Sequence, residues 1–318
     1  MEYVTLGRTG LKVSAAGLGA GGASRLGQSH GRSFDHSVSI VRAAIDAGVN
    51  FIDTAAAYRT EEIVGAAIRP VRDQIVLSTK LGVVKPGTSA LGDDYLTGSE
   101  FEQLAEANLK RLGVDYIDIF HLHGVMPDQY DYCRAELAPA LERMRDKGQI
   151  RFLGLTERFI YDPGHAMLER AFKDDCWDVV MSGFNFINQT ARSRVFPLTV
   201  KKNIGVLIMF AVRRALRDEA TLLEVMQELA TRNEIDPALL EADAPMDFLY
   251  EDGGPESLVE AAYRYCRHEP GADVVLTGTG SHEHLAQNIG SLKKSPLPEN
   301  TLARLSEIFG RVESISGN

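Results

Sequence analysis

Four residues of types that can move protons stand at related places in the sequence. Asp53, Lys80 and His123 each lie at the end of a short, β-branched, apolar run. Tyr58 follows Asp53 in the next loop. Because the carboxyl ends of neighbouring parallel strands face the same end of a sheet or barrel, we expect the four side chains to converge. A lysine cation favours the phenolate form of a tyrosine, so the set predicts a proton-transfer site.

Each of the four residues fits a role in the interconversion of a carbonyl and an alcohol. In reduction, Tyr58 would give its proton to the carbonyl oxygen while hydride reaches the carbon, and in oxidation its phenolate form would take the proton. Asp53 would hold Lys80 charged and oriented. His123 would form a hydrogen bond with the substrate oxygen.

The elements that must position these residues follow a regular alternation. Short β-branched runs are each followed by a segment of helical period, which is typical of repeated βα units and a parallel sheet. The expected strands cover residues 16–19, 50–53, 75–80, 116–121, 150–155, 178–182, 205–209 and 273–277. Since no break in composition divides the chain, we predict one α/β domain over 1–318, a (β/α)8 TIM barrel. A β-hairpin at 3–6 and 11–14 would plug the barrel floor, and a C-terminal helix at 301–312 would fold across the barrel.

Two expected insertions emerge at the end of the barrel where the four residues meet. They are the segments 124–132 and 212–255, and we expect them to choose the substrate because long loops in compact domains are usually functional. Acidic residues in the longer segment favour polyhydroxylated or cationic ligands, although a run of carboxylates is more often a solvated face. These residues are Asp218, Glu219, Glu224, Asp243 and Asp247.

Composition narrows the class of protein. The chain has 318 residues, of which 44% are hydrophobic and 25% charged, and these proportions are typical of a folded globular protein. A net charge of −10 argues against partners such as nucleic acid or an anionic membrane surface. The three cysteines are widely spaced, and no segment approaches the ~20 apolar residues of a membrane span. We expect a cytoplasmic protein, monomeric or a small homo-oligomer, that acts on a small molecule.

At the level of motifs, the sequence resembles the aldo-keto reductase family along essentially its whole length. Four motifs occur in the family's order: an Asp-Thr-Ala…Tyr motif, a strand-ending Thr-Lys, a Leu-Gly-x-Asp-Tyr-Ile-Asp…Leu-His segment and a Lys-Gly-Gln-Ile-Arg-Phe-Leu-Gly segment. They lie at 53–58, 79–80, 112–123 and 147–154. The resemblance implies the barrel fold and an NAD(P)-dependent oxidoreductase. It assigns the family's catalytic tetrad to Asp53, Tyr58, Lys80 and His123.

The resemblance also implies a nicotinamide dinucleotide lying across the barrel mouth. Matched by position, the cofactor-binding residues are Gly19, Thr156, Asn185, Phe210, Gly278, Gly280, Ser281, His284 and Asn288. Phe210 would stack on the nicotinamide, and the helix start after residue 278 would hold phosphate. The chain departs from its family at the carboxamide site, where Thr156-Glu157 replaces a Ser-Asn pair and Met181 replaces a glutamine.

The resemblance leaves the choice between NAD and NADP open, with NAD slightly favoured. Where NADPH-preferring members place Lys or Arg on the 2′-phosphate, this chain has Ser281 and His284, so the charge-assisted pair is missing. The pattern is closest to the aldose 1-dehydrogenases that act on L-galactose or L-fucose. The reaction would then include oxidation of an aldose at C1, and a general NADPH-dependent aldehyde or ketone reductase is the alternative.

Two other classes of function fit parts of the sequence. The same barrel could hold a nucleotide as a regulatory module without turnover, since a fold alone does not fix an activity. His121 and His123 share one face of a strand and could bind zinc in a hydrolase. Catalytic zinc requires three protein ligands and only these two are visible, so we expect no metal.

Overall fold

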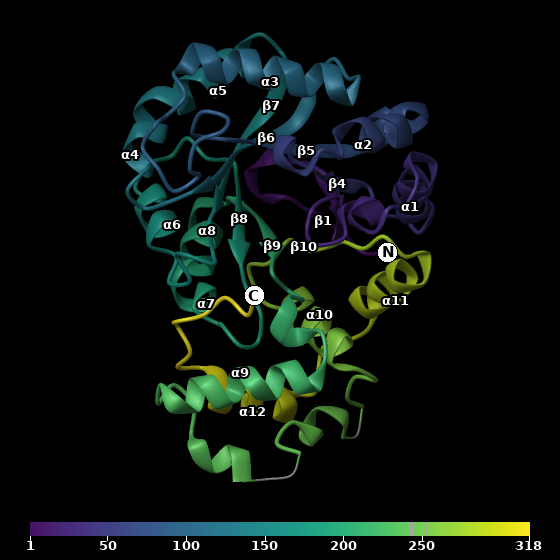
Figure 1. Ribbon diagram of the computed structural model, residues 1–318, viewed down its shortest axis with the longest axis vertical. Helices are drawn as coiled ribbons and strands as arrows, with labels where there is room; N and C mark the ends of the chain where they lie inside the picture. The colour runs from purple at the N-terminus through teal and green to yellow at the C-terminus, as the bar shows by residue number, and fades with distance from the viewer. Residues whose placement is uncertain (242–243, 252) are drawn as a thin grey trace.

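Eight parallel strands close into a barrel in the order β10-β3-β4-β5-β6-β7-β8-β9, which confirms the expected (β/α)8 architecture (Figure 1). The computed structural model describes residues 1–241, 244–251 and 253–318. The barrel strands are β3 (Ala16–Gly19), β4 (Phe51–Asp53), β5 (Val76–Gly82), β6 (Ile117–Val125), β7 (Ile150–Glu157), β8 (Val179–Gly183), β9 (Gly205–Met209) and β10 (Val274–Thr277).

Strand β6 runs further than the sequence suggested. The expected strand ended at residue 121, whereas β6 continues to Val125 and its pairing with β7 is irregular between Leu122 and Val125. Such an irregularity re-aims the side chains beside it. It falls at His123, and residues 124 and 125, expected in a loop, belong to the strand.

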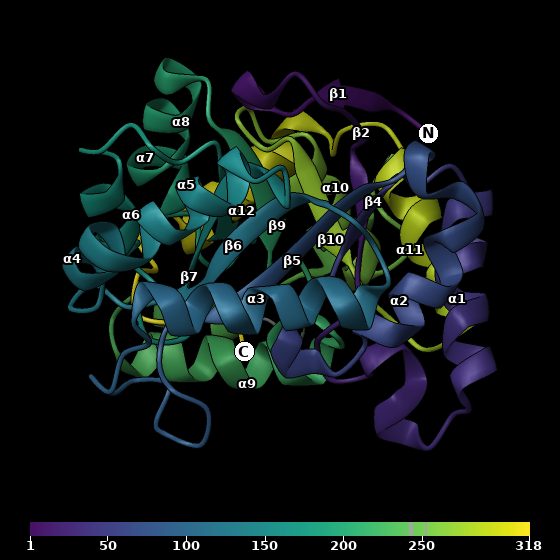
Figure 2. The ribbon, with the colours of Figure 1, turned by 90° about the horizontal axis from the view of Figure 1, so that it is seen from above.

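Helices surround the barrel, and α3 shows how the sequence sets their ends (Figure 2). Thr97 accepts a hydrogen bond from the backbone of Glu100, whose carboxylate accepts one from the backbone of Thr97, and Gly113 ends the helix with φ +65°. The helices are α1 (Phe34–Asp46), α2 (Glu61–Ile68), α3 (Gly98–Leu112), α4 (Tyr130–Tyr132), α5 (Ala138–Asp146), α6 (Ala166–Ala171), α7 (Ala191–Arg194), α8 (Phe196–Lys202), α9 (Glu219–Thr231), α10 (Leu258–Arg267), α11 (His282–Lys293) and α12 (Glu299–Phe309).

The N-terminal hairpin closes the floor of the barrel, as expected. Its strands β1 (Tyr3–Thr5) and β2 (Lys12–Ser14) pair antiparallel. Leu6 and Val13 are fully buried and pack with apolar side chains that point inward from the barrel strands. The backbone lies so close to β9 that a Cβ at Gly7 would stand 2.2 Å from the nitrogen of Gly205. This approach requires glycine.

The long segment 212–255 has its own short helices in the part that the structure describes. They are η6 (Arg214–Leu216), α9, η7 (Pro237–Glu241) and η8 (Asp247–Tyr250). Asp218 accepts a hydrogen bond from the backbone of Thr221 and caps α9, and Glu219 accepts one from the Tyr250 hydroxyl at 2.6 Å. These carboxylates therefore stabilise the segment itself. Asp243 lies outside the described residues.

The C-terminal tail returns to the barrel after α12, which occupies 299–309 where 301–312 was expected. The Asn188 amide donates to the carbonyl of Ile315 at 2.8 Å. The backbone of Ala215 donates to the carbonyl of Gly317 at 3.1 Å. The chain end therefore lies close to β8 and β9, as Figure 1 shows. The sequence carried no signal for this return.

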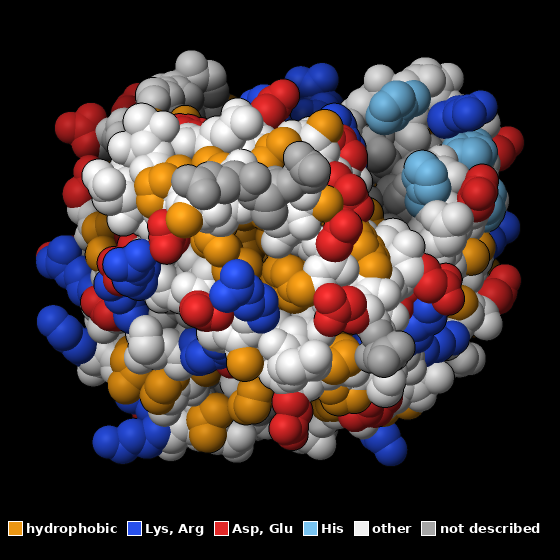
Figure 3. All heavy atoms as spheres, turned by 90° about the horizontal axis from the view of Figure 1, so that it is seen from below, with side chains coloured by type: hydrophobic (Ala, Val, Ile, Leu, Met, Phe, Trp, Pro, Cys, Tyr) orange, Lys and Arg blue, Asp and Glu red, His pale blue; other side chains and the backbone are white. Residues whose placement is uncertain are grey.

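The face seen from below shows how charge is spread over the surface (Figure 3). Acidic and basic side chains stand interspersed there, with hydrophobic side chains exposed between them. None of the helices in the described ranges is both long enough and apolar enough to cross a membrane.

Replacing Gly154 by alanine tests how tightly the barrel interior is packed. A Cβ at Gly154 would stand 2.1 Å from Nδ1 of His121 on the neighbouring strand. Gly154→Ala should therefore lower the free energy of unfolding by about 1–3 kcal/mol, the usual cost of overpacking. Urea unfolding measures this change. In Gly290→Ala, where no atom lies within 4 Å of the new Cβ in helix α11, the same measurement should show no loss. Equal stabilities of the two variants would contradict the packing described.

Candidate active site

A buried ion pair joins strands β4 and β5 at the carboxyl end of the barrel. Nζ of Lys80 lies 2.5 Å from Oδ2 of Asp53 and 2.7 Å from the carbonyl oxygen of Thr54. The Lys80 side chain is 1% exposed. Ser78 donates to the other carboxylate oxygen at 2.8 Å. Burial raises the pKa of Asp53, and the neighbouring lysine cation opposes this shift.

A hydrogen-bond chain extends the ion pair to strand β6. The Ser78 hydroxyl donates to Asp53, so Nε2 of His121, 3.0 Å away, is the donor to Ser78. Burial holds the pKa of His121 well below its usual range, and the ring is neutral. The sequence analysis did not include Ser78 in the site. Its position two residues before Lys80 on one strand was the available signal, since alternate residues share a face.

Tyr58 and His123 meet beside the ion pair. Tyr58 ends the short helix η3 (Ala56–Tyr58), and its hydroxyl lies 3.5 Å from Nε2 of His123. Nζ of Lys80 lies 5.2 Å from the centroid of the tyrosine ring. Gly21 fixes the other side of the ring, because a Cβ there would stand 2.5 Å from it. The structure thus brings together the four side chains expected to converge, Asp53, Tyr58, Lys80 and His123.

His123 is neutral in this environment. Burial lowers its pKa to about 3, and the cations of Lys80 and Arg158 contribute to the shift. A neutral imidazole carries one N–H, so His123 can donate a single hydrogen bond. This is the state needed to bind the oxygen of an uncharged carbonyl or alcohol group.

Phe210 follows β9 in a left-handed backbone conformation, with φ +67°. Its carbonyl oxygen accepts a hydrogen bond from the Asn185 amide at 3.1 Å. The Phe159 ring stands edge-on to the Phe210 ring, with 5.5 Å between centroids. The guanidinium carbon of Arg213 lies 4.2 Å from the Phe210 centroid. Phe210 therefore contacts both an aromatic ring and a cation at the barrel end.

Thr156 and Asn185 already have backbone partners. The Thr156 hydroxyl accepts a hydrogen bond from the backbone of Gly124 at 2.6 Å. Both polar groups of Asn185 are used as well. Its amide donates to the carbonyls of Phe210 and Ser316, and its oxygen accepts from two backbone N–H groups in the following turn. The hydrogen bonds of these two side chains thus go to backbone groups of the protein.

A second buried pair, missed by the sequence analysis, occupies the end of β7. The Glu157 carboxylate accepts a hydrogen bond from Nδ1 of His165 at 2.9 Å and another from the backbone N–H of Gly183 at 2.7 Å. Ser182 donates to it at 3.1 Å. The His165 ring stacks on Phe159 at 5.2 Å. The carboxylate that stands at the family's carboxamide position is thus largely satisfied by the protein. Residue 165 gave no sequence signal because it lies in an irregular loop.

The remaining glycines and polar residues gather where β3 and β10 end and α11 begins. A Cβ at Gly278 would stand 2.6 Å from the carbonyl oxygen of Gly19. A Cβ at Gly280 would stand 2.4 Å from the backbone nitrogen of Gly27. Ser281 caps α11 by accepting a hydrogen bond from the backbone of His284.

Asn288 and several histidines lie around this helix start. The Asn288 amide donates to the Thr277 hydroxyl at 2.9 Å. His36 contacts the carbonyl of Gly280 at 2.8 Å, and the His36 and His282 rings lie 5.6 Å apart. Figure 3 shows histidine side chains gathered on one part of the surface. The residues predicted to bind the adenosine end of the cofactor are thus neighbours in the structure. In the sequence they lie far from the tetrad.

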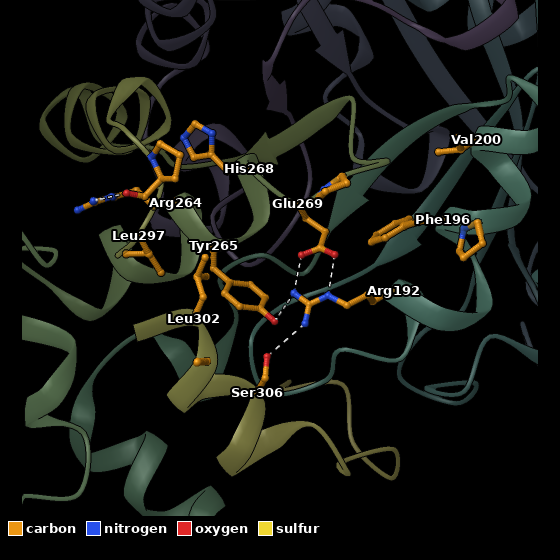
Figure 4. Close-up of a pocket in the computed structure, with 14 residues that line it drawn as sticks. Arg192, Phe196, Val200, Arg264, Tyr265, His268, Glu269, Leu297, Leu302 and Ser306 are labelled. Carbon is orange, nitrogen blue, oxygen red and sulfur yellow. Dashed lines mark hydrogen bonds and ion pairs between the residues drawn. The ribbon is translucent and has the colours of Figure 1, made fainter. Parts of the chain in front are cut away.

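Metal-ligating side chains and surface hollows elsewhere in the fold bear on where a ligand can bind. Over residues 1–241, 244–251 and 253–318, no group of three or more His, Cys, Asp or Glu side chains is placed to bind a metal ion. A hollow of about 670 Å³ lies between α8, α10 and α12, beside an ion pair of Arg192 with Glu269 (Figure 4). No tetrad residue lines this hollow. The hollow is therefore separate from the four side chains that meet at the barrel end.

Comparison with known proteins agrees with the barrel fold. A profile described as the Aldo/keto reductase family matches residues 17–309. L-galactose dehydrogenase of Arabidopsis thaliana is 26% identical, over 99% of this chain and 97% of its own. A probable voltage-gated potassium channel subunit beta of the same plant is 28% identical, over 93% of each chain.

A solved structure also superimposes on the barrel. It is an aldo/keto reductase from Klebsiella pneumoniae in complex with NADP and acetate, with a TM-score of 0.67. The two chains are 22% identical, and the match covers 96% of this chain and 95% of the other. At this identity, the likeness shows the fold alone.

The lowered pKa of His123 predicts a pH effect on stability. Between pH 6.5 and 3 the unfolded chain binds a proton at His123 that the folded chain does not, so this residue costs stability there and none above pH 6.5. Relative to His123→Gln, the wild type should lose about 2 kcal/mol of unfolding free energy from pH 7 to 5. Urea unfolding at both pH values measures this. Exposed His30→Gln should show no such change, and equal behaviour of the two variants would refute the shift.

Proposed function

The chain belongs to the aldo/keto reductase family and is an oxidoreductase of carbonyl and alcohol groups, and we propose that its tetrad performs the proton transfer. The observation that carries this proposal is the Tyr58 hydroxyl, which lies 3.5 Å from a neutral His123 and beside the Lys80 cation. A general acid or base needs this kind of neighbour to change protonation state during the reaction. Hydrogen bonds of catalytic groups are often long before substrate binds.

The barrel end fits a nicotinamide dinucleotide as the hydride carrier. Phe210 presents an aromatic ring directly after β9, at the same end of the barrel as the tetrad. The first turn of α11 has backbone N–H groups without partners in the helix, which suit a phosphate. Gly278 and Gly280, just before that turn, allow close approach of the backbone at Gly19 and Gly27. Asn288 lies further along the same helix. When bound, the nicotinamide would supply or accept hydride.

The residues of this chain then handle the proton. In reduction, the Tyr58 hydroxyl donates its proton to the carbonyl oxygen as the carbon is reduced. The Lys80 cation stabilises the phenolate that results. The Asp53 carboxylate keeps this lysine charged within the barrel, where an unpaired ammonium would be costly. His123 donates its N–H to the same substrate oxygen. Oxidation of an alcohol follows these steps in reverse.

For the substrate and the cofactor, we propose oxidation of an aldose at C1 with NAD. Similarity to L-galactose dehydrogenase supports the sugar substrate. Ser281 and His284 at the start of α11 support NAD, since neither is a permanent cation for a 2′-phosphate. Reduction of aldehydes or ketones with NADPH is the alternative. The similarity to a channel subunit favours a regulatory module, but a complete tetrad supports turnover.

Removal of the Tyr58 hydroxyl tests the catalytic assignment. Tyr58→Phe should lower kcat by about 100-fold or more, because general acid and base catalysis contributes that much. The dissociation constant for the nucleotide, measured by fluorescence quenching, should be unchanged. Turnover equal to that of the wild type would exclude Tyr58 as the proton donor, and lost nucleotide affinity would show a misfolded variant.

Cofactor choice is tested by binding. The dissociation constant for NADH should be lower than that for NADPH, because the 2′-phosphate finds no lysine or arginine among the residues expected to hold it. Quenching of intrinsic fluorescence measures both constants. A strong preference for NADPH would favour the general reductase over the aldose dehydrogenase.

A further inference from the structure

Two arginines flank Tyr58 and His123 without an acidic partner. Neither Arg158 nor Arg213 forms an ion pair with any acidic side chain in the described parts of the chain. Their neighbours Arg214 and Arg217 do form ion pairs, with acidic residues of the same segment. Since a partly buried cation loses hydration, the absence of a partner calls for a physical reason.

Arg213 lies at the reacting end of the site. Its guanidinium carbon stands 4.2 Å from the Phe210 centroid. One of its nitrogens is 3.9 Å from the position a Cβ would take at Gly22, next to the glycine that packs on Tyr58. Burial lowers the pKa of Arg213, and Tyr58 is among the groups that act on it. The Arg213 cation therefore lies near the glycine loop that packs on Tyr58.

Arg158 lies against Gly124, the residue after His123. Its Nε donates to the carbonyl of Gly124 at 3.1 Å, which leaves the two terminal nitrogens of the guanidinium for other partners. Burial also lowers the pKa of Arg158. Gly124 directly follows His123 in β6, so this hydrogen bond ties Arg158 to the strand end that carries His123.

The acidic groups nearby are already engaged. Asp53 is paired with Lys80, and its second oxygen accepts from Ser78. Glu157 accepts hydrogen bonds from His165 and from the backbone of Gly183. The site thus has two positive charges that no described carboxylate balances. An anionic ligand would balance them, and guanidinium groups bind carboxylate and phosphate through paired hydrogen bonds.

We propose that Arg213, supported by Arg158, binds a carboxylate or phosphate group of the substrate, so that the enzyme selects anionic carbonyl or hydroxyl compounds. This inference rests on the proposed function and narrows it from aldoses in general to those that carry a charged group. It differs from the expectation drawn from the acidic residues of segment 212–255. Those described in the structure, such as Asp218 and Glu219, serve the segment itself.

The test compares substrates that differ only in charge. One set is the carboxybenzaldehyde isomers and their methyl esters, and the other is glyceraldehyde 3-phosphate and glyceraldehyde. In the wild type, kcat/KM for the best anion should exceed that for its neutral partner by about 10-fold or more. Arg213→Met should lower this ratio by about 10-fold or more, and Arg213→Lys should retain part of it. Arg214→Met, which removes the adjacent exposed arginine, should leave it unchanged.

Binding measurements separate the possible failures. If Arg213→Met weakens NADH binding but leaves the ratio unchanged, the guanidinium serves the dinucleotide and the inference is wrong. An unchanged ratio with unchanged NADH binding also overturns it. Turnover of neutral aldehydes without a preference for anions would refute the inference and leave the proposed function standing. If no aldehyde turns over, the proposed function fails, and Arg213-dependent binding of benzoate over benzamide would still support the anion site.

Discussion

The ion pair of Lys80 with Asp53 is the constraint on which the rest of the site depends. Removing two charges from water costs several kcal/mol per ion unless their geometry and hydrogen bonds are good. Here the Asp53 carboxylate accepts a hydrogen bond from the Ser78 hydroxyl, and the Lys80 ammonium donates one to the Thr54 carbonyl. Each of these partners comes from β4, β5 or the residue after them, so adjacent strands in correct register are a condition for the pair. A slip of one residue would turn Lys80 to the helix side of the barrel.

The two ends of the barrel differ in character: one is apolar and the other carries buried polar groups. The floor is closed by the hairpin, whose Leu6 and Val13 pack with apolar side chains of the barrel strands, such as Phe51. The opposite end carries buried polar groups that are nearly all hydrogen-bonded within the protein. An atom without a partner in the described structure is Nδ1 of His121, which faces Gly154. The apolar floor thus offsets the cost of a polar, preorganised end.

Much of this arrangement could be predicted because it depends on local pattern. The eight strands follow from β-branched runs, and parallel strands with aligned ends bring Asp53, Lys80 and His123 together without any knowledge of contacts. Ser78 was within reach of the same logic, as it alternates with Lys80. The bounds of β6 were not, because its extension depends on pairing with β7.

Other parts of the site depend on tertiary contacts that a sequence does not display. Glu157 stands at a strand end, where a carboxylate could be expected to bind a ligand. Its partner His165 comes from an irregular loop, so the pair is visible only in the three-dimensional structure. Asn185 matched a family position, and its hydrogen bonds go to backbone from two distant segments. The unpaired state of Arg213 is likewise a fact about surroundings. The type of a residue shows which interactions it can form, and only the fold shows which partners lie within reach of it.

The amide of Asn185 joins two places that are far apart in the chain. Its two N–H groups donate to the carbonyls of Phe210 and Ser316, each at 3.1 Å. Phe210 is held in a backbone conformation that is unfavourable for a bulky residue, so its position relies on such outside restraints. The last residues of the chain therefore act as a brace for the aromatic ring. Residues 315–317 thus belong to the framework that holds the candidate active site, in the same way as the strands that surround it.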